Sequence, residues 1–164
     1  MRYIALIFSF LLSLCLNVDA QDNLLPTANL NTIDGKNIEI QKYSQEGNPK
    51  LISLWATWCG PCRMELKALD KVYPEWKEKY NVEIVAASVD IPPMLNSAKA
   101  MFERNDWDFT FLHDVNQEFI SALGIRGIPF SILVDGEGQV QSVQQGYFPG
   151  YEKKLEKKIA AIVQ

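Results

Sequence analysis

Cysteine and histidine are scarce in this chain, which has three cysteines and one histidine in 164 residues. A structural zinc site usually takes four ligands, drawn from two cysteine pairs or from cysteines and histidines. Cys59 and Cys62 form the one close pair, whereas Cys15 lies near the N-terminus and His113 lies far along the chain. We therefore expect no metal site and no bound cofactor.

Excess positive charge is also lacking, because the formal net charge is -4. Nucleic-acid binding depends on clustered lysines and arginines that displace counterions from phosphates. The one lysine-rich stretch, 153–158, alternates with apolar residues at helical spacing, which predicts the solvated face of a terminal helix. The sequence indicates no nucleic-acid partner.

Long apolar runs are missing except within residues 1–20, where one follows Arg2 and ends in small residues. That pattern predicts a cleavable signal peptide over 1–20 and an exported domain over 21–164. The run is shorter than the roughly 20 residues that cross a bilayer. A lipid anchor on Cys15 is the alternative.

The rest of the chain has the composition of a globular protein, with 48% apolar and 22% charged residues overall. A hairpin is predicted around Asp34-Gly35, and an apolar run at 50–57 predicts a buried strand. Pro74 should kink or break the helix that follows the cysteines. Further strands are predicted at 82–90, 108–114, 130–135 and 140–147, with helices at 92–105, 115–124 and from 149. This alternation indicates an α/β fold with helices on both faces of a sheet.

Cys59 and Cys62 lie where the strand at 50–57 ends and the next helix begins, with Gly60 and Pro61 between them. Free backbone N–H groups at a helix N-terminus stabilise a thiolate, which is the form that attacks a disulfide. We expect Cys59 to be the exposed nucleophile and Cys62, one turn inside, to resolve the mixed disulfide. Loss of Cys15 with the signal would leave only this pair in an oxidising compartment.

Two other uses of the pair fit less well. Haem attachment requires histidine directly after the second cysteine, and Arg63 stands there. A purely structural disulfide would close a loop too short to stabilise much. The pattern favours thiol-disulfide exchange.

The stretch "WCGPC" at 58–62 and Gly127-Ile128-Pro129 before a strand resemble the thioredoxin superfamily. The signal, the hairpin and the helix at 92–105 resemble its exported TlpA/ResA-like branch, which is related to redoxins and AhpC/TSA proteins. The resemblance implies a thioredoxin fold: a central mixed β-sheet with helices on both faces, an N-terminal hairpin and one inserted helix. It also implies a cis bond at Ile128-Pro129, with the backbone of Ile128 binding an extended stretch of the partner.

Ser53 occupies the position where thioredoxins carry a buried aspartate that accepts the proton of the second cysteine. Glu65 matches a glutamate that is common in the branch, and it shares a helix face with Cys62 three residues earlier. Glu65 is therefore the candidate proton relay; the alternative is a first-turn acid that merely suits the helix dipole. Lys67 stands where the branch commonly has a kinking proline.

The sequence also predicts roles for two tryptophans and for the histidine. Trp58 is expected to cover the disulfide as a substrate-binding residue, although Trp55 and Trp58 could both be packing aromatics. His113, at a strand end, is predicted to be a loop or hydrogen-bonding residue rather than an acid–base group.

The sequence thus predicts an exported thiol-disulfide oxidoreductase that reduces protein disulfides in the periplasm, as a monomer, with electrons from a membrane donor. A thiol peroxidase is one rival, but that chemistry wants threonine three residues before its cysteine, and Thr57 lies two before Cys59. A binding module with an idle disulfide is the other rival.

Overall fold

The apolar runs form the centre of a mixed sheet in the computed structural model, which describes residues 23–163. β3 (Lys50–Trp55) runs parallel to β4 (Glu83–Ser88) and antiparallel to β6 (Phe130–Val134). All residues of β3 are buried, as expected for a strand covered on both faces. The predicted signal peptide and Cys15 lie outside the described residues.

Within residues 23–163 the sheet has seven strands, in the order β2-β1-β5-β4-β3-β6-β7. The outer strands are β1 (Asn29–Thr32), β2 (Asn37–Glu39), β5 (Thr110–His113) and β7 (Val140–Gln145). The predicted hairpin is confirmed as the antiparallel pair β1 and β2. Gly35 in its turn has a φ of 87°, a conformation that favours glycine.

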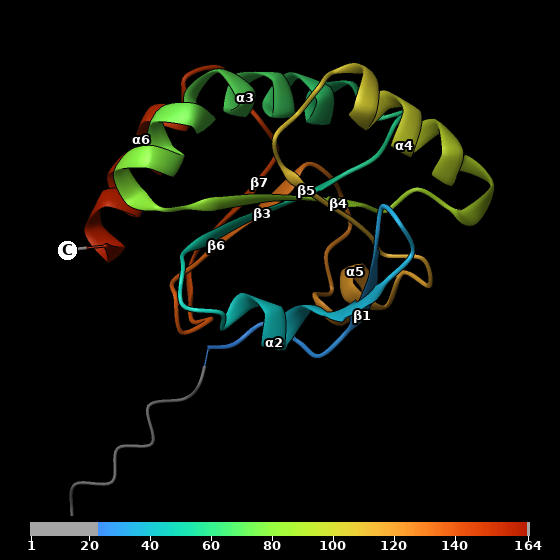
Figure 1. The fold of residues 1–164 in the computed structure, drawn as a ribbon, viewed down its shortest axis with the longest axis horizontal. Helices are drawn as coiled ribbons and strands as arrows, with labels where there is room; N and C mark the ends of the chain where they lie inside the picture. The colour runs from blue at the N-terminus through green and yellow to red at the C-terminus, as the bar shows by residue number, and fades with distance from the viewer. Residues whose placement is uncertain (1–22, 164) are drawn as a thin grey trace, which may run out of the picture.

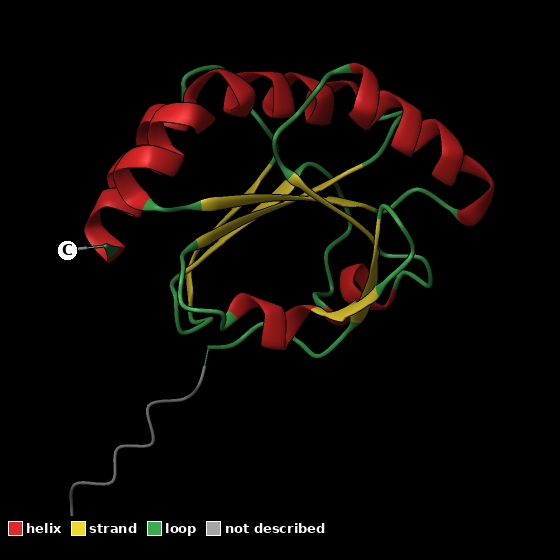
Figure 2. Cartoon of the chain, viewed as in Figure 1, coloured by secondary structure: helices red, strands yellow, loops and turns green. Residues whose placement is uncertain are grey.

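Helices cover both faces of the sheet, as the sequence predicts (Figure 1). Figure 2 shows the longer helices on one side of the strands and the short ones on the other. The longer helices are α3 (Gly60–Tyr80), α4 (Leu95–Arg104) and α6 (Tyr151–Ile162), and the short ones are α2 (Ile40–Ser44) and α5 (Glu118–Ala122). α4 is the predicted inserted helix, and the 3₁₀ turn η2 (Pro92–Met94) leads into it.

Two local features differ from expectation. α2 follows β2 directly and was not predicted. The sequence predicts a kink or a break at Pro74, and the break is wrong because α3 continues through this residue. Pro74 is exposed, while Tyr73 and Trp76 beside it are buried against the sheet. The burial of this apolar face holds the helix together where the proline removes one backbone hydrogen bond.

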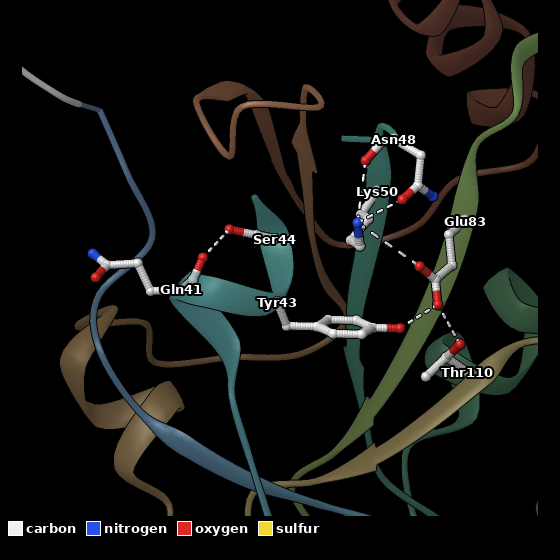
Figure 3. A network of polar contacts seen from close by, with 7 residues as sticks. All are labelled: Gln41, Tyr43, Ser44, Asn48, Lys50, Glu83 and Thr110. Atoms are coloured by element: carbon white, nitrogen blue, oxygen red, sulfur yellow. Dashed lines mark hydrogen bonds and ion pairs between the residues drawn. The ribbon is translucent and has the colours of Figure 1, made fainter. Parts of the chain in front are cut away.

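A buried lysine lies at the opposite end of β3 from the cysteines (Figure 3). The ammonium group of Lys50 donates to the side-chain and backbone oxygens of Asn48 at 2.8 and 3.2 Å, and it lies 3.9 Å from a carboxylate oxygen of Glu83. Tyr43 and Thr110 donate to the other oxygen of that carboxylate. Burial lowers the pKa of Lys50. Burial, followed by the hydrogen bond to Glu83, raises the pKa of Tyr43.

Within residues 23–163, no helix combines the length and the apolar character that crossing a membrane requires.

Candidate active site

The two cysteines lie at the junction of β3 and α3, where the sequence places them. Cys59 and Cys62 form a disulfide with an S–S distance of 2.00 Å. Cys59 is the N-cap of α3, and its sulfur accepts the backbone N–H of Cys62 at 3.2 Å. Pro61 occupies the first turn, where its missing N–H leaves no helical bond unmade. The N-terminal end of the helix thus points at the sulfur of Cys59.

Cys59 is expected to be exposed and Cys62 to be buried, but the difference in exposure between them is small in the structure. Cys59 retains 5% exposure and Cys62 has 0%. Cys59 is therefore the more accessible sulfur, although in the disulfide form it is nearly buried rather than openly exposed.

The bond between Ile128 and Pro129 is cis, as the resemblance implies. The sulfur of Cys59 lies 3.8 Å from the carbonyl oxygen of Ile128. The turn before β6 is thereby placed against the disulfide. Among the described residues, Ile128 makes no backbone–backbone hydrogen bond. Its binding of another chain stays a prediction.

Glu65 is buried beneath this site, with 1% exposure. One carboxylate oxygen accepts the hydroxyl of Ser53 at 2.8 Å, and the other accepts the hydroxyl of Ser131 at 2.7 Å. These serines are direct partners across β3 and β6. Burial raises the pKa of Glu65, and the two serine hydrogen bonds partly oppose that shift.

The sequence points to Ser53 only because it stands where thioredoxins carry a buried aspartate, and no local pattern points to Ser131. Both hold the carboxylate of Glu65. The interpretation of Glu65 as an acid that only suits the helix dipole is wrong, because its side chain points inward to the sheet. The two hydrogen bonds of Glu65 among the described residues go to the serines, so the relay to Cys62 stays a prediction.

The charge of Glu65 contributes to the raised pKa values of two tyrosines. Burial, with a smaller contribution from the Glu65 carboxylate, raises the pKa of Tyr151 to about 12. Tyr147 has its pKa raised by burial first, with Glu152 and Glu65 as smaller causes. The start of α6 therefore belongs to the electrostatic surroundings of Glu65.

A second buried polar group supports the loop before Cys59, and sequence reasoning missed it. Asp90 accepts the backbone N–H and the hydroxyl of Thr57 at 2.9 and 2.8 Å. It also accepts the hydroxyl of Ser88 at 3.0 Å. The polar residues that follow an apolar strand at its carboxyl end were the available signal, since loops from neighbouring parallel strands meet there.

His113 lies beside Asp90 at the end of β5, with 1% exposure. Its Nε2 donates to the backbone carbonyl of Asp90 at 2.7 Å. The prediction of a hydrogen-bonding histidine is confirmed.

The two tryptophans have different surroundings. Trp55 is fully buried and packs edge-to-face on Trp107, with ring centroids 6.0 Å apart. Trp58 is 64% exposed, so the alternative of a core aromatic is wrong for it. Its cover over the disulfide stays a prediction.

No group of three or more histidine, cysteine, aspartate or glutamate side chains within residues 23–163 is arranged to hold a metal ion. The arrangement that remains is a cysteine pair at a helix N-terminus, a cis proline against it and a buried carboxylate.

The fold and this arrangement define a thioredoxin-like protein. The solved structure of a thioredoxin-like protein from Porphyromonas gingivalis is 35% identical, with a TM-score of 0.76 over 85% of this chain and 91% of that one. StoA from Bacillus subtilis shares the fold at 20% identity, with a TM-score of 0.64 over 83% of this chain and 98% of that one. The predicted thioredoxin fold is confirmed.

The chain belongs to the Redoxin family, whose profile matches residues 20–159. Its relatives include the thiol-disulfide oxidoreductase ResA of Halalkalibacterium halodurans, 31% identical over 117 residues. The match covers 71% of this chain and 64% of that relative, a little under two-thirds of its length. ResA of Bacillus anthracis is 31% identical over 130 residues, which cover 75% of this chain and 71% of that protein. The resemblance to the ResA-like branch is confirmed.

Proposed function

We propose that this protein is an exported thiol-disulfide oxidoreductase that reduces disulfides in protein substrates. The observation that carries the proposal is the disulfide at the N-terminus of α3, with Cys59 as the N-cap. The relatives named as thiol-disulfide oxidoreductases support the activity. The predicted signal peptide supports export to the periplasm, where a membrane donor would supply electrons to the monomeric protein.

The first step of the reaction uses the reduced protein. The Cys59 thiolate, stabilised by the N–H of Cys62 and the helix N-terminus, attacks one sulfur of the partner's disulfide. A mixed disulfide forms and the partner's other sulfur leaves as a thiolate. The peptide groups of Ile128 hold an extended stretch of the partner by strand-like hydrogen bonds, beside Pro129, while Trp58 covers the outer side.

The second step regenerates the disulfide seen in the structure. The Cys62 thiol loses its proton, with Glu65 as the acceptor, and the thiolate attacks the sulfur of Cys59. The partner's second sulfur leaves as a thiolate. The partner gains two electrons, and its two thiolates take up protons, while the Cys59–Cys62 pair is oxidised.

Insulin reduction with dithiothreitol as the electron source tests this activity. Wild-type protein should accelerate insulin precipitation, and Cys59→Ser should abolish the acceleration. Equal rates for the two proteins would refute the proposal. Rapid thiol-dependent consumption of hydrogen peroxide without insulin reduction would instead favour the peroxidase.

The redox potential tests the direction of electron flow. A reductant such as thioredoxin lies near -270 mV, whereas a strong oxidant such as DsbA lies near -120 mV. We expect a value on the reducing side, measured by equilibration with graded dithiol buffers. A potential above about -180 mV would contradict the assignment as a reductase.

A Cys62→Ser variant tests the order of the cysteines. It should accumulate mixed disulfides on Cys59 with periplasmic proteins, visible on non-reducing gels. Cys59→Ser is the matched control and should trap none. Equal trapping by the two variants would contradict the assigned roles.

A further inference from the structure

A groove beside the cysteine pair is rimmed by positive charge. It has a volume of about 420 Å³ and lies between the first turns of α3 and the C-terminal end of α4. Figure 1 shows that end of α4 beside α3, at the opposite side of α3 from α6. Gly60, which stands between the two cysteines, lines the groove. A ligand in the groove would therefore reach the active site.

Among the residues that the structure describes, three cationic side chains line this groove and no acidic one does. The cations are Arg63 and Lys67 from α3 and Arg104 from α4. None of the three forms an ion pair among residues 23–163, whose four ion pairs all involve other lysines. The whole chain carries a net charge of -4, so this face differs in sign from the molecule's overall charge.

Apolar side chains also take part in the lining of the groove. Met64, Met101 and Trp107 contribute to its lining. Trp107 is 6% exposed and packs on Trp55, which fixes this wall to the core. Met64 is 56% exposed, and methionine adapts to ligands of different shape. A lining that combines apolar side chains with unpaired cations suits side chains that combine apolar stems with carboxylates.

We propose that this groove binds an acidic segment of the polypeptide whose disulfide is being reduced. The proposal rests on the proposed function for the nature of the partner, because the groove begins at Gly60 and a segment lying in it adjoins the sulfur under attack. Arg63, Lys67 and Arg104 pair with carboxylates of the segment. The groove thereby selects clients with acidic residues near their cysteines, and the attraction weakens with salt.

Peptide binding tests the groove independently of catalysis. Two rhodamine-labelled peptides of equal length are compared, one with aspartates and glutamates around a central serine pair and one with asparagines and glutamines in their place. Fluorescence anisotropy gives their dissociation constants with the oxidised protein. The groove variant is Lys67→Gln/Arg104→Gln, which spares Arg63 because that residue follows Cys62. The matched control is Lys153→Gln/Lys157→Gln, which removes the same charge from exposed positions on α6.

The acidic peptide should bind about threefold or more tightly than the neutral peptide at low salt. The groove variant should lose this preference, as should the wild type in 0.5 M NaCl, while the α6 control keeps it. Equal binding of the two peptides, or a preference that survives in the groove variant, would overturn the proposal. Displacement of the acidic peptide by equimolar citrate would overturn the polypeptide as occupant in favour of a small anion.

The same peptides with the cysteines restored separate this inference from the proposed function. Peptides that bind with the expected preference but are not reduced would refute the reductase and leave the acidic-segment site standing. Peptides that are reduced at equal rates and bind equally would refute the groove and leave the reductase standing.

Discussion

The buried carboxylate of Glu65 should make the stability of this protein depend on pH. Glu65 is 1% exposed, and burial raises its pKa above the value of an exposed glutamate, near 4.5. In the native state the proton is therefore held more tightly than in the unfolded state. The resulting stabilisation is fully present below the unfolded pKa and is lost as the pH rises through the native pKa.

Glu65→Gln removes this dependence. Each unit by which the native pKa exceeds the unfolded one lowers wild-type stability by about 1.4 kcal/mol at higher pH. The glutamine can still bond to Ser53 and Ser131, but its N–H₂ group carries two donors, whereas the neutral acid carries one and the carboxylate none. That rearrangement costs about 1 kcal/mol at any pH. The variant should thus be slightly less stable than wild type at pH 4, and the difference should shrink or reverse by pH 8.

Urea unfolding of both oxidised proteins between pH 4 and pH 8 measures the difference in the free energy of unfolding. Glu75→Gln, at an exposed position on the same helix, serves as the control for loss of a carboxylate. A difference between wild type and Glu65→Gln that stays constant across this range would refute the reasoning, because it would mean that the buried group titrates alike in both states.

Substitutions at three further residues are tested by urea unfolding at pH 7. Glu83→Ala should lower the free energy of unfolding by about 3 kcal/mol, because it leaves the buried ammonium of Lys50 without its carboxylate. Glu83→Gln keeps a hydrogen-bond acceptor for Tyr43, so comparing the two variants separates the loss of charge from the loss of hydrogen bonds. Asp90→Ala should lower it by about 2 kcal/mol, since it orphans two buried donors of Thr57, and a loss under 0.5 kcal/mol would contradict this. Trp58→Ala should change it by less than about 0.5 kcal/mol, because that side chain is 64% exposed; a larger loss would show that the ring packs on the fold.

The sequence was sufficient to predict features that depend on neighbours along the chain. The hairpin at Asp34-Gly35, the buried strand predicted at 50–57 and the cysteines at a helix start all follow from local patterns. The structure has all three, with the strand ending at Trp55. The sequence pattern did not predict α2, because its five residues are too few to show a helical period. The helix break predicted at Pro74 does not occur, because the tertiary packing of α3 outweighs one missing hydrogen bond.

The site was predictable only in part, because sequence patterns relate residues that are close along the chain. The cysteine pair is visible in a local motif, and the cis proline is implied by the resemblance to thioredoxins, whereas the partners of Glu65 depend on strand pairing. Ser131 lies 66 residues after Glu65 in the chain, and no local pattern joins them. The contact of Asp90 with Thr57 spans 33 residues and likewise depends on two strands ending side by side.

The pairing of Ser53 with Ser131 bears on how the sheet finds its alignment. β6 reads Phe-Ser-Ile-Leu-Val and is almost wholly buried, so apolar burial alone distinguishes poorly between neighbouring alignments of this strand. A slip by one residue would turn the Ser131 hydroxyl to the opposite face and leave the Glu65 carboxylate with a single donor. The buried acid therefore favours the observed alignment of β6, in which each of its two oxygens has a serine donor.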